Sequence, residues 1–563
     1  MYKYRIFLLL LAVWITFQSS ADAQGVQQKQ DDYYLRVLQL SEITSDAATY
    51  HLRPFIGFPN VKSVREEHPL QNRFKLEENP LFESRIGLKF SPYEPVWFQS
   101  YNTTLPRGGH DGAIWQGKGY NTALSAGFKA EFGPLLIDFR PMIGMAQNLS
   151  YDLGPYPPAT RRTVGEVHEY AYRGRSVIVD HVQRYGDSAY SWADWGDSSV
   201  ELRAGSFRLA YSNKRFWTGP GVNTSLQFGY NAPGFRHLYL GTHRPWETVI
   251  GTLEMAYIFG MTKESDYFTQ GRQIDSHSVN ALIVAWQPWF TDRFSMGGIR
   301  TYFFPYPDDF SQYWMQAKRL FEPGLRQALR DNGVPRGHDP DNQVANLFIR
   351  YMIPEHGFEF YVEYGRNDHS GNWRDFRGQP GHHRGYTMGM IKTLKLQRNQ
   401  IVALSAEFSE LSTSRTALVR GGGYLGGWYT HGNQLLGLSN KGQLFGTEHG
   451  PGPNIQTIRI DWYKEKNSWS FTLARIGYHN SNYDQHFNAW YLPQNGGDIE
   501  RWEARNIELM AGVQGSFQLR RNIEMLASLS QSYIFNRHHI KENDVMNTRF
   551  EIVIRTNIEG WLR

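Results

Sequence analysis

Residues 507–519, IELMAGVQGSFQL, alternate apolar and polar side chains. Ile507, Leu509 and Val513 share one parity, whereas Glu508 and Gln514 share the other. Side chains along a β-strand point alternately to its two faces, so this stretch predicts a strand with one apolar and one polar face.

The same alternation recurs to the end of the chain, in residues 124–132, 253–259, 358–364, 523–529 and 549–555. The connections are of two kinds. Residues 354–357, 464–467 and 520–522 are short turns, whereas residues 152–175, 367–386 and 438–454 are long and rich in Gly, His and Asn. Short turns at one end and long loops at the other are typical of bacterial outer-membrane barrels.

Composition agrees with a β-rich chain. The 563 residues are 15% aromatic, with a mean hydropathy of -0.53, which excludes a bundle of apolar transmembrane helices. A net charge of +5 is small and dispersed, so we expect no nucleic-acid partner. The chain has no Cys and hence no disulfide or thiolate metal site. A large soluble β protein is the alternative, but no propeller-like repeat of about 40 to 50 residues is present.

The N-terminal residues have the pattern of an export signal. Lys3 and Arg5 precede the apolar residues 6–17, and Ala21-Asp22-Ala23 forms a cleavage motif. We therefore expect residues 1–23 to be a signal peptide, cleaved near Ala23, that directs the protein to the outer membrane. Residues 31–40 have helix-like spacing, with Asp31 and Asp32 at the start, and predict a helix. We expect residues 24–82 to form a periplasmic helical segment or plug. Residues 83–563 predict the outer-membrane β-barrel with long extracellular loops.

Motifs for catalysis or cofactors are incomplete. Residues 112–119 resemble a phosphate-binding loop, but Gly119 replaces the Ser/Thr that binds magnesium. His-Glu-x-x-His and Gly-x-Ser-x-Gly are absent from the sequence. We expect no catalytic, cofactor-binding or metal-binding residues and no enzymatic activity. The remaining alternative is a glycan or lipid hydrolase using acids from Asp308, Asp309, Asp368 and Asp375.

Aromatic, Arg and amide residues cluster in residues 213–231 and 421–433. Flat aromatic rings stack on sugar rings, and Arg binds carboxylates in bidentate fashion. The predicted polysaccharide-binding residues are Arg215, Trp217, Asn223, Trp428, Tyr429, His431, Arg374 and Arg384. For each one, an interfacial aromatic or turn residue is the structural alternative. If the polymer is rich in uronic acid, Arg374 and Arg384, with Arg161 and Arg162, are expected to pair with its carboxylates.

The same stretches resemble a known family. Residues 214–221, KRFWTGPG, are similar to the Arg-Trp-Trp-Gly-Pro-Gly stretch of the Wzi-type capsule assembly family. Residues 101–103, 111–119, 140–148, 428–432 and 450–452 support the resemblance in the same order along the chain. Thr218 is an apparent insertion, and Phe216 replaces a Trp of the family pattern.

The resemblance implies an all-β membrane protein, a large antiparallel transmembrane β-barrel of about 18 strands with a small N-terminal helical segment on the periplasmic side. It implies a lectin-like protein that binds capsular or exopolysaccharide at the cell surface during capsule assembly. The expected partners are that polysaccharide and outer-membrane lipids, with a monomer favoured. An outer-membrane porin or polysaccharide export channel is the alternative function.

Overall fold

The structure is a computed structural model, and it describes residues 24–43, 49–53, 80–155, 168–172, 179–268, 276–307, 309–322, 341–368, 372–379, 381, 383–414, 427–431, 436–520 and 522–556. The predicted signal peptide, Arg161 and Arg162 lie outside the described residues. Within these ranges, every helix is too short or too polar to cross a membrane.

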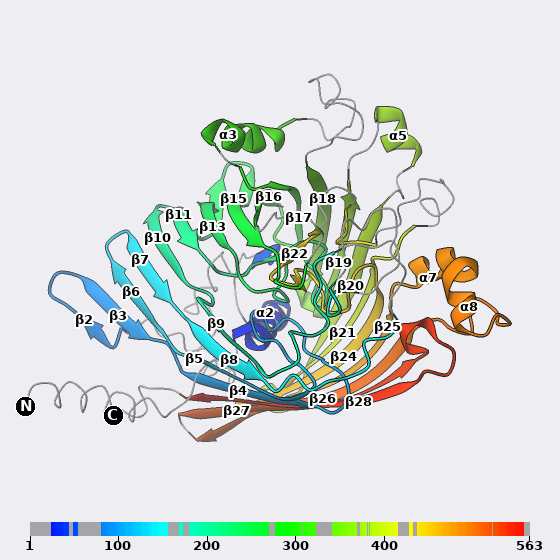
Figure 1. Ribbon diagram of the computed structural model, residues 1–563. Helices are drawn as coiled ribbons and strands as arrows, with labels where there is room; N and C mark the ends of the chain where they lie inside the picture. Colours follow the sequence, from blue (N-terminus) through cyan, green and yellow to red (C-terminus); the bar gives the residue numbers. More distant parts are fainter. Residues whose placement is uncertain are drawn as a thin grey trace, which may run out of the picture.

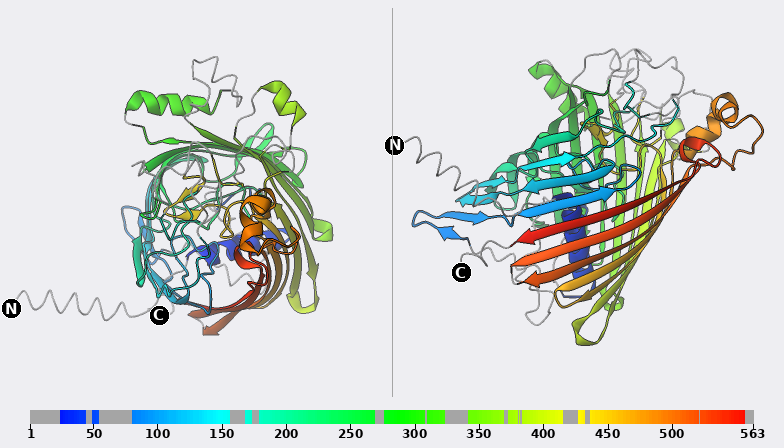
Figure 2. Two further views of the ribbon diagram at one scale, coloured as in Figure 1. Left: turned by 45° about the vertical axis from the view of Figure 1, so that its right-hand side comes forward. Right: turned by 60° about the horizontal axis from the view of Figure 1, so that its bottom comes forward.

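A 24-stranded antiparallel sheet forms a strongly curved, barrel-shaped wall (Figures 1 and 2). Its long strands follow one another as antiparallel neighbours: β15 (Gly251–Lys263), β16 (Ser276–Pro288), β17 (Phe294–Pro305), β18 (Asn342–Ile353), β19 (Phe358–Asn367), β20 (Arg384–Lys395), β21 (Ile401–Glu410), β24 (Asn454–Lys464), β25 (Asn467–Gly477), β26 (Ile507–Arg520), β27 (Ile523–Phe535) and β28 (Val545–Thr556). The alternation predicted for residues 507–519 is confirmed, because Leu509 and Val513 are exposed on the outer face while Glu508 is buried.

The N-terminal part of the wall has shorter strands: β2 (Phe82–Glu83), β3 (Leu88–Pro92), β4 (Val96–Asn102), β5 (Gly119–Ser125), β6 (Phe128–Phe132), β7 (Leu135–Phe139), β8 (Met142–Ala146), β9 (Tyr190–Asp194), β10 (Ser199–Ala204), β11 (Phe207–Ser212), β13 (Arg236–Thr242) and β14 (Trp246–Thr248). Strand β28 pairs with β4, which places the last strand beside the first part of the wall. From there the wall divides into two ladders, β4–β5–β8–β9 and β11–β10–β7–β6–β3–β2. Their end strands, β9 and β2, are not paired with each other.

The short strands separate where the backbone bends. The Tyr93 amide donates to the Gly127 carbonyl at 2.9 Å, and the Arg140 amide donates to Ser198 Oγ at 2.8 Å. Pro141 has no amide hydrogen to continue a ladder. The Arg140 guanidinium lies over the Tyr93 ring, 3.3 Å from its centroid. These contacts hold the bends of neighbouring strands at the same height along the wall.

The space that the wall encloses is filled by other segments of the chain. Helix α2 (Gln24–Leu40) lies inside the ring of strands (Figure 2). It confirms the helix predicted at residues 31–40, although it begins earlier in the chain. Tyr230 donates a hydrogen bond to the Asp32 carboxylate of α2 at 2.6 Å. Residues 213–235, between β11 and β13, are almost entirely buried, as are most of residues 436–453. We call residues 213–235 the luminal loop.

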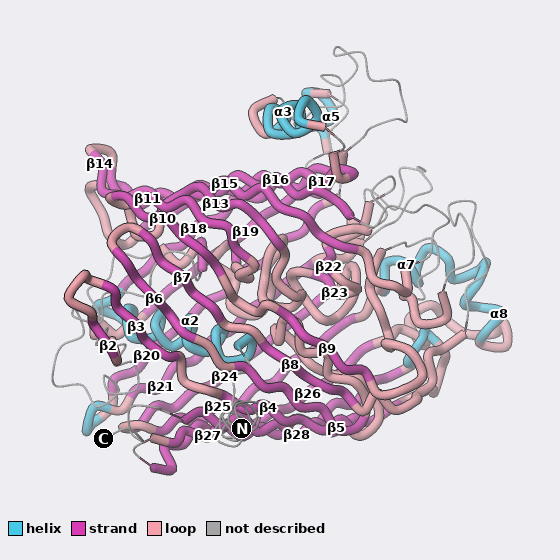
Figure 3. The backbone as a smooth tube through the Cα atoms, turned by 60° about the vertical axis from the view of Figure 1, so that its left-hand side comes forward, coloured by secondary structure: helices cyan, strands magenta, loops and turns pink. Residues whose placement is uncertain are grey.

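The two ends of the wall differ as predicted. Short turns at one end include the 3-10 turns η3 (Pro354–His356) and η4 (Gln397–Asn399). The opposite end carries α3 (Phe310–Arg319), α5 (Trp373–Gly378), α7 (Asn480–His486) and α8 (Leu492–Gln494) (Figure 3). We call these the short-turn end and the long-loop end.

Candidate functional site

The first predicted cluster lies inside the lumen. Arg215 and Trp217 belong to the luminal loop, and the Trp217 side chain is fully buried. Its ring lies 5.1 Å from the His110 ring and 5.4 Å from the Tyr230 ring. β1 (Leu52–Arg53), in the segment after α2, pairs with β12 (Trp217–Thr218). Trp217 therefore joins the luminal loop to the N-terminal segment.

The second predicted cluster meets the same loop. The Trp428 indole donates to the Leu226 carbonyl at 2.5 Å, and the Tyr429 hydroxyl donates to the Ser225 carbonyl at 2.6 Å. His431 is buried, 3.6 Å from a carboxylate oxygen of Asp368. The structure thus brings both clusters to the luminal loop, and the rings of Trp217, Trp428 and Tyr429 are buried.

Asn223 belongs to the same luminal loop, whereas Arg374 and Arg384 do not join this cluster. The backbone amide of Asn223 donates to the Glu407 carboxylate at 2.9 Å. Arg374 is exposed on α5, outside the wall (Figure 1). Arg384 begins β20 and lies over the Tyr386 ring, 5.0 Å from its centroid. A glycan-binding role for all eight residues stays a prediction.

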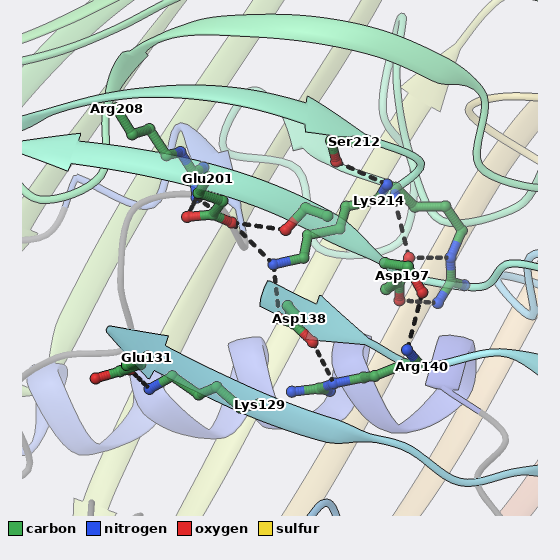
Figure 4. A network of polar contacts seen from close by, with 12 residues as sticks. Lys129, Glu131, Asp138, Arg140, Asp197, Glu201, Arg208, Ser212 and Lys214 are labelled. Atoms are coloured by element: carbon green, nitrogen blue, oxygen red, sulfur yellow. Dashed lines mark hydrogen bonds and ion pairs between the residues drawn. The ribbon is translucent and has the colours of Figure 1, made fainter. Parts of the chain in front are cut away.

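Arg215 fastens the luminal loop to the bent part of the wall. Its backbone amide, Nε and Nη2 donate to the Asp197 carboxylate at 3.0, 3.1 and 2.6 Å. Figure 4 shows Asp197 beside the ion pairs that Lys214 forms with Asp138 and Glu201 across neighbouring strands. Hydrogen bonds between ionised partners are the strong ones in proteins. The contact between Arg215 and Asp197 therefore fixes where the luminal loop enters the lumen.

A cavity of about 290 Å³ lies among the connections of the long-loop end. Its walls come from residues 105–116, 448–450 and 478–491, from the ends of β26 and β27, and from the 3-10 turn η6 (Arg537–His539). Aromatic lining residues are Trp115, Tyr151, Tyr172, Tyr478, Trp490 and Tyr491. The sequence prediction did not include this cavity, although residues 478–491, YHNSNYDQHFNAWY, have the same aromatic and amide composition as the stretches that it chose.

One network organises the cavity wall. The Arg107 guanidinium donates to Glu508 at 2.6 Å, to the Tyr478 hydroxyl at 3.0 Å and contacts His449 Nδ1 at 3.2 Å. Ser532 also donates to Glu508, at 2.6 Å. Burial disfavours the charged guanidinium, but the Glu508 carboxylate outweighs it and raises the pKa of Arg107. The charge of Arg107 is therefore held within the wall.

Two further acids line the cavity in different charge states. Burial opposes ionisation of Glu448, but His449, His110 and Arg107 outweigh it and lower its pKa to about 2. Burial raises the pKa of Asp111 to about 7. One oxygen of Asp111 accepts from the Gly109 amide at 2.6 Å and from Gln116 at 2.5 Å.

Among the described lining residues, several buried polar atoms have no hydrogen-bond partner: Asp111 Oδ1, Trp115 Nε1, His181 Nδ1, His479 Nε2, Asn506 Oδ1 and His539 Nδ1. Burial lowers the pKa of His479 and of His539 to about 3, so both imidazoles are neutral near pH 7. Buried polar atoms are normally paired with protein, water or ligand. The cavity is therefore suited to a small polar ligand that offers hydrogen-bond donors and acceptors.

The described residues contain no cluster of His, Cys, Asp or Glu that could hold a metal ion. Asp309, one of the acids considered for hydrolysis, caps α3 by accepting from the Gln312 amide at 3.1 Å. The side chains of Asp308 and Asp375 lie outside the described residues.

No known protein-family model and no curated protein matches the sequence. Among solved structures, the Escherichia coli outer-membrane protein Wzi, a carbohydrate-binding β-barrel involved in group 1 capsule assembly, has a TM-score of 0.58 at 12% identity, covering 92% of this chain and 97% of that one. OprD of Pseudomonas aeruginosa has a TM-score of 0.39 at 10% identity, covering 83% and 94%. OpdQ of the same organism has a TM-score of 0.40 at 8% identity, covering 83% and 97%. The likeness to Wzi shows that the chain has the fold of an outer-membrane β-barrel.

Proposed function

We propose that this protein binds a capsular or exopolysaccharide at the cell surface and takes part in its assembly or attachment, without chemical turnover. The observation that carries the proposal is a polar, aromatic cavity at the long-loop end above a lumen filled by α2 and the luminal loop. A filled lumen favours retention of a polymer over its conduction. The carbohydrate binding of Wzi supports the same function for a chain of like fold.

The proposal includes the finer architecture. Strands β3 and β4, β5 and β6, β7 and β8, β9 and β10, and β13 and β14 are each taken as one strand that continues across a bend. Without the short β2, the 24 strands then form a closed barrel of about 18. The long-loop end faces the cell exterior, and α2 serves as a plug toward the periplasmic side.

A modest cavity suits weak binding of a repeating polymer. One cavity holds only a short segment, whereas a polysaccharide offers the same segment many times. When one polymer engages many barrels, each further contact is intramolecular and retention exceeds the single-site affinity. We therefore expect weak binding of short oligosaccharides and strong retention of the long polymer.

The test uses the purified full chain in detergent and in planar lipid bilayers. We expect saturable binding to bacterial polysaccharides on a glycan array, together with negligible steady conductance. Steady conductance without glycan binding would refute the proposal and favour the porin or export-channel alternative. Release of shortened glycan products would instead identify a hydrolase.

A further inference from the structure

We propose that the long-loop cavity binds an uncharged, hydroxyl-bearing segment of the polysaccharide and disfavours uronic acids. This inference rests on the proposed function and adds the class of sugar. It concerns the cavity alone, since Arg374 and Arg384 are not among its lining residues.

Among the described residues that line the cavity, no cation is available for a carboxylate. Arg107 and Arg537 are the only Lys or Arg residues among them. Arg107 is engaged by Glu508, Tyr478 and His449. Arg537 donates to the Asp152 carboxylate at 3.3 Å and also to the Asp152 carbonyl. A uronate could gain a guanidinium partner only by sharing it with these acceptors.

The acids Glu448 and Asp111 line the cavity, and the cations Lys29, Arg107 and Arg549 offset part of their charge. Glu448 lies 3.4 Å from His449 Nε2 and 4.0 Å from His110 Nε2, and burial lowers the pKa of both imidazoles. Asp111 adds a second negative charge whenever it is ionised. The carboxylate of a uronic acid would enter beside these like charges, which is unfavourable in a partly enclosed site.

The unpaired atoms call for a ligand that both donates and accepts hydrogen bonds, since Trp115 Nε1 can only donate. Asn506 Oδ1 can only accept, and Asp111 Oδ1 accepts when the carboxylate is ionised and donates when it is protonated. His479 Nε2 and His539 Nδ1 accept or donate according to tautomer. A sugar hydroxyl both donates and accepts, so a hydroxyl-bearing ring can satisfy these atoms. An ionised carboxylate has no proton to donate. Trp490 and Tyr491 add aromatic surface on which a pyranose ring can pack.

The experiment compares neutral and uronate-containing bacterial glycans on one array, using the full chain in detergent at low and high salt. We expect the bound glycans to be neutral, with less than about a twofold change between salt conditions, because no ion pair is formed. A bound set dominated by uronates, or binding weakened about tenfold by salt, would overturn the inference while preserving polysaccharide binding. An array with no bound glycan would instead refute the proposed function.

Two variants test the assigned atoms. Asp111→Asn keeps the acceptor for Gly109 and Gln116 but replaces the unpaired oxygen with a donor, so binding of the best neutral glycan at pH 8, where Asp111 is mainly ionised, should fall about tenfold. Glu508→Gln releases the Arg107 guanidinium and should introduce salt-sensitive uronate binding. Asp187→Asn, at a strongly exposed carboxylate, is the control and should change neither preference. If Asp111→Asn and Glu508→Gln both bind as the wild type does, the assignment of the cavity is wrong.

Discussion

The Arg36 guanidinium of the luminal helix α2 forms a fully buried ion pair with the Glu359 carboxylate of strand β19. Arg350 of β18 donates to the other oxygen of Glu359 at 2.7 Å and to Gln39 of α2 at 2.8 Å. One carboxylate therefore accepts from both the helix and the wall. This shared contact fixes α2 in the lumen.

Arg36→Ala should loosen α2 from the wall. Removing one partner of a buried pair is strongly destabilising, by about 3–5 kcal/mol, because buried polar groups lose their compensation. We expect faster proteolysis of α2 and the appearance of steady conductance in planar bilayers. Lys395→Ala is a matched control, since Lys395 reaches Glu42 at 3.2 Å near the end of α2, but both side chains are about half exposed. Equal resistance of α2 to proteolysis in the two variants would show that Arg36 does not hold the helix.

Gly385→Ala should displace Trp428. A Cβ at Gly385 would lie 2.8 Å from the Trp428 ring, too close for an undisturbed contact. Overpacking of this kind costs about 1–3 kcal/mol, and it also strains the indole hydrogen bond to Leu226. The thermal unfolding midpoint in detergent should fall. Gly378→Ala, where no atom lies within 4 Å of the added Cβ, should leave the midpoint almost unchanged.

Asp197→Asn should release the entry of the luminal loop. The amide retains the size of the carboxylate but loses the charge that binds Arg215, and hydrogen bonds to charged groups contribute about 1.5–3 kcal/mol. We expect earlier proteolytic cleavage within residues 213–235. Asp484→Asn provides the comparison, because Asp484 accepts from Arg505 at 2.7 Å in a more exposed pair. Cleavage at the same rate in both variants would contradict the anchoring role.

Local pattern predicted the wall but not its contents. Alternation in residues 507–519 identified a strand and its two faces, because side-chain direction has a period of two. Composition singled out the two stretches that contain Trp217 and Trp428, but it does not state on which side of a wall a loop folds, and both indoles are buried. Their enclosure depends on contacts such as Trp428 with Leu226, which are 202 residues apart. The cavity likewise joins segments from residue 105 to residue 547, and no local pattern specifies that assembly.

The pH dependence of stability tests the role of another buried acid, Asp180. One of its oxygens accepts from the Ser265 amide at 2.7 Å and the Gly442 amide at 3.1 Å, while the other accepts from the Ser265 hydroxyl at 2.6 Å. These contacts join the segment from residue 179 to the connection after β15 and to the inward residues 436–453. Burial raises the pKa of Asp180 from 3.8 to about 7. The protonated form is thus favoured in the folded protein.

Because this folded-state pKa is above the unfolded value, the stabilisation from proton binding is complete below about pH 4 and is lost as the pH rises through about 7. Asp180→Asn should remove that loss: its amide oxygen accepts from both backbone amides, and its NH2 group donates to the Ser265 hydroxyl. The unfolding midpoint of the wild type, relative to that of the variant, should therefore decrease between pH 5 and pH 8. Asp187→Asn should follow the wild type, since the pKa of Asp187 is lowered and lies below this window. Parallel curves for the wild type and Asp180→Asn would show that Asp180 is already ionised at pH 5.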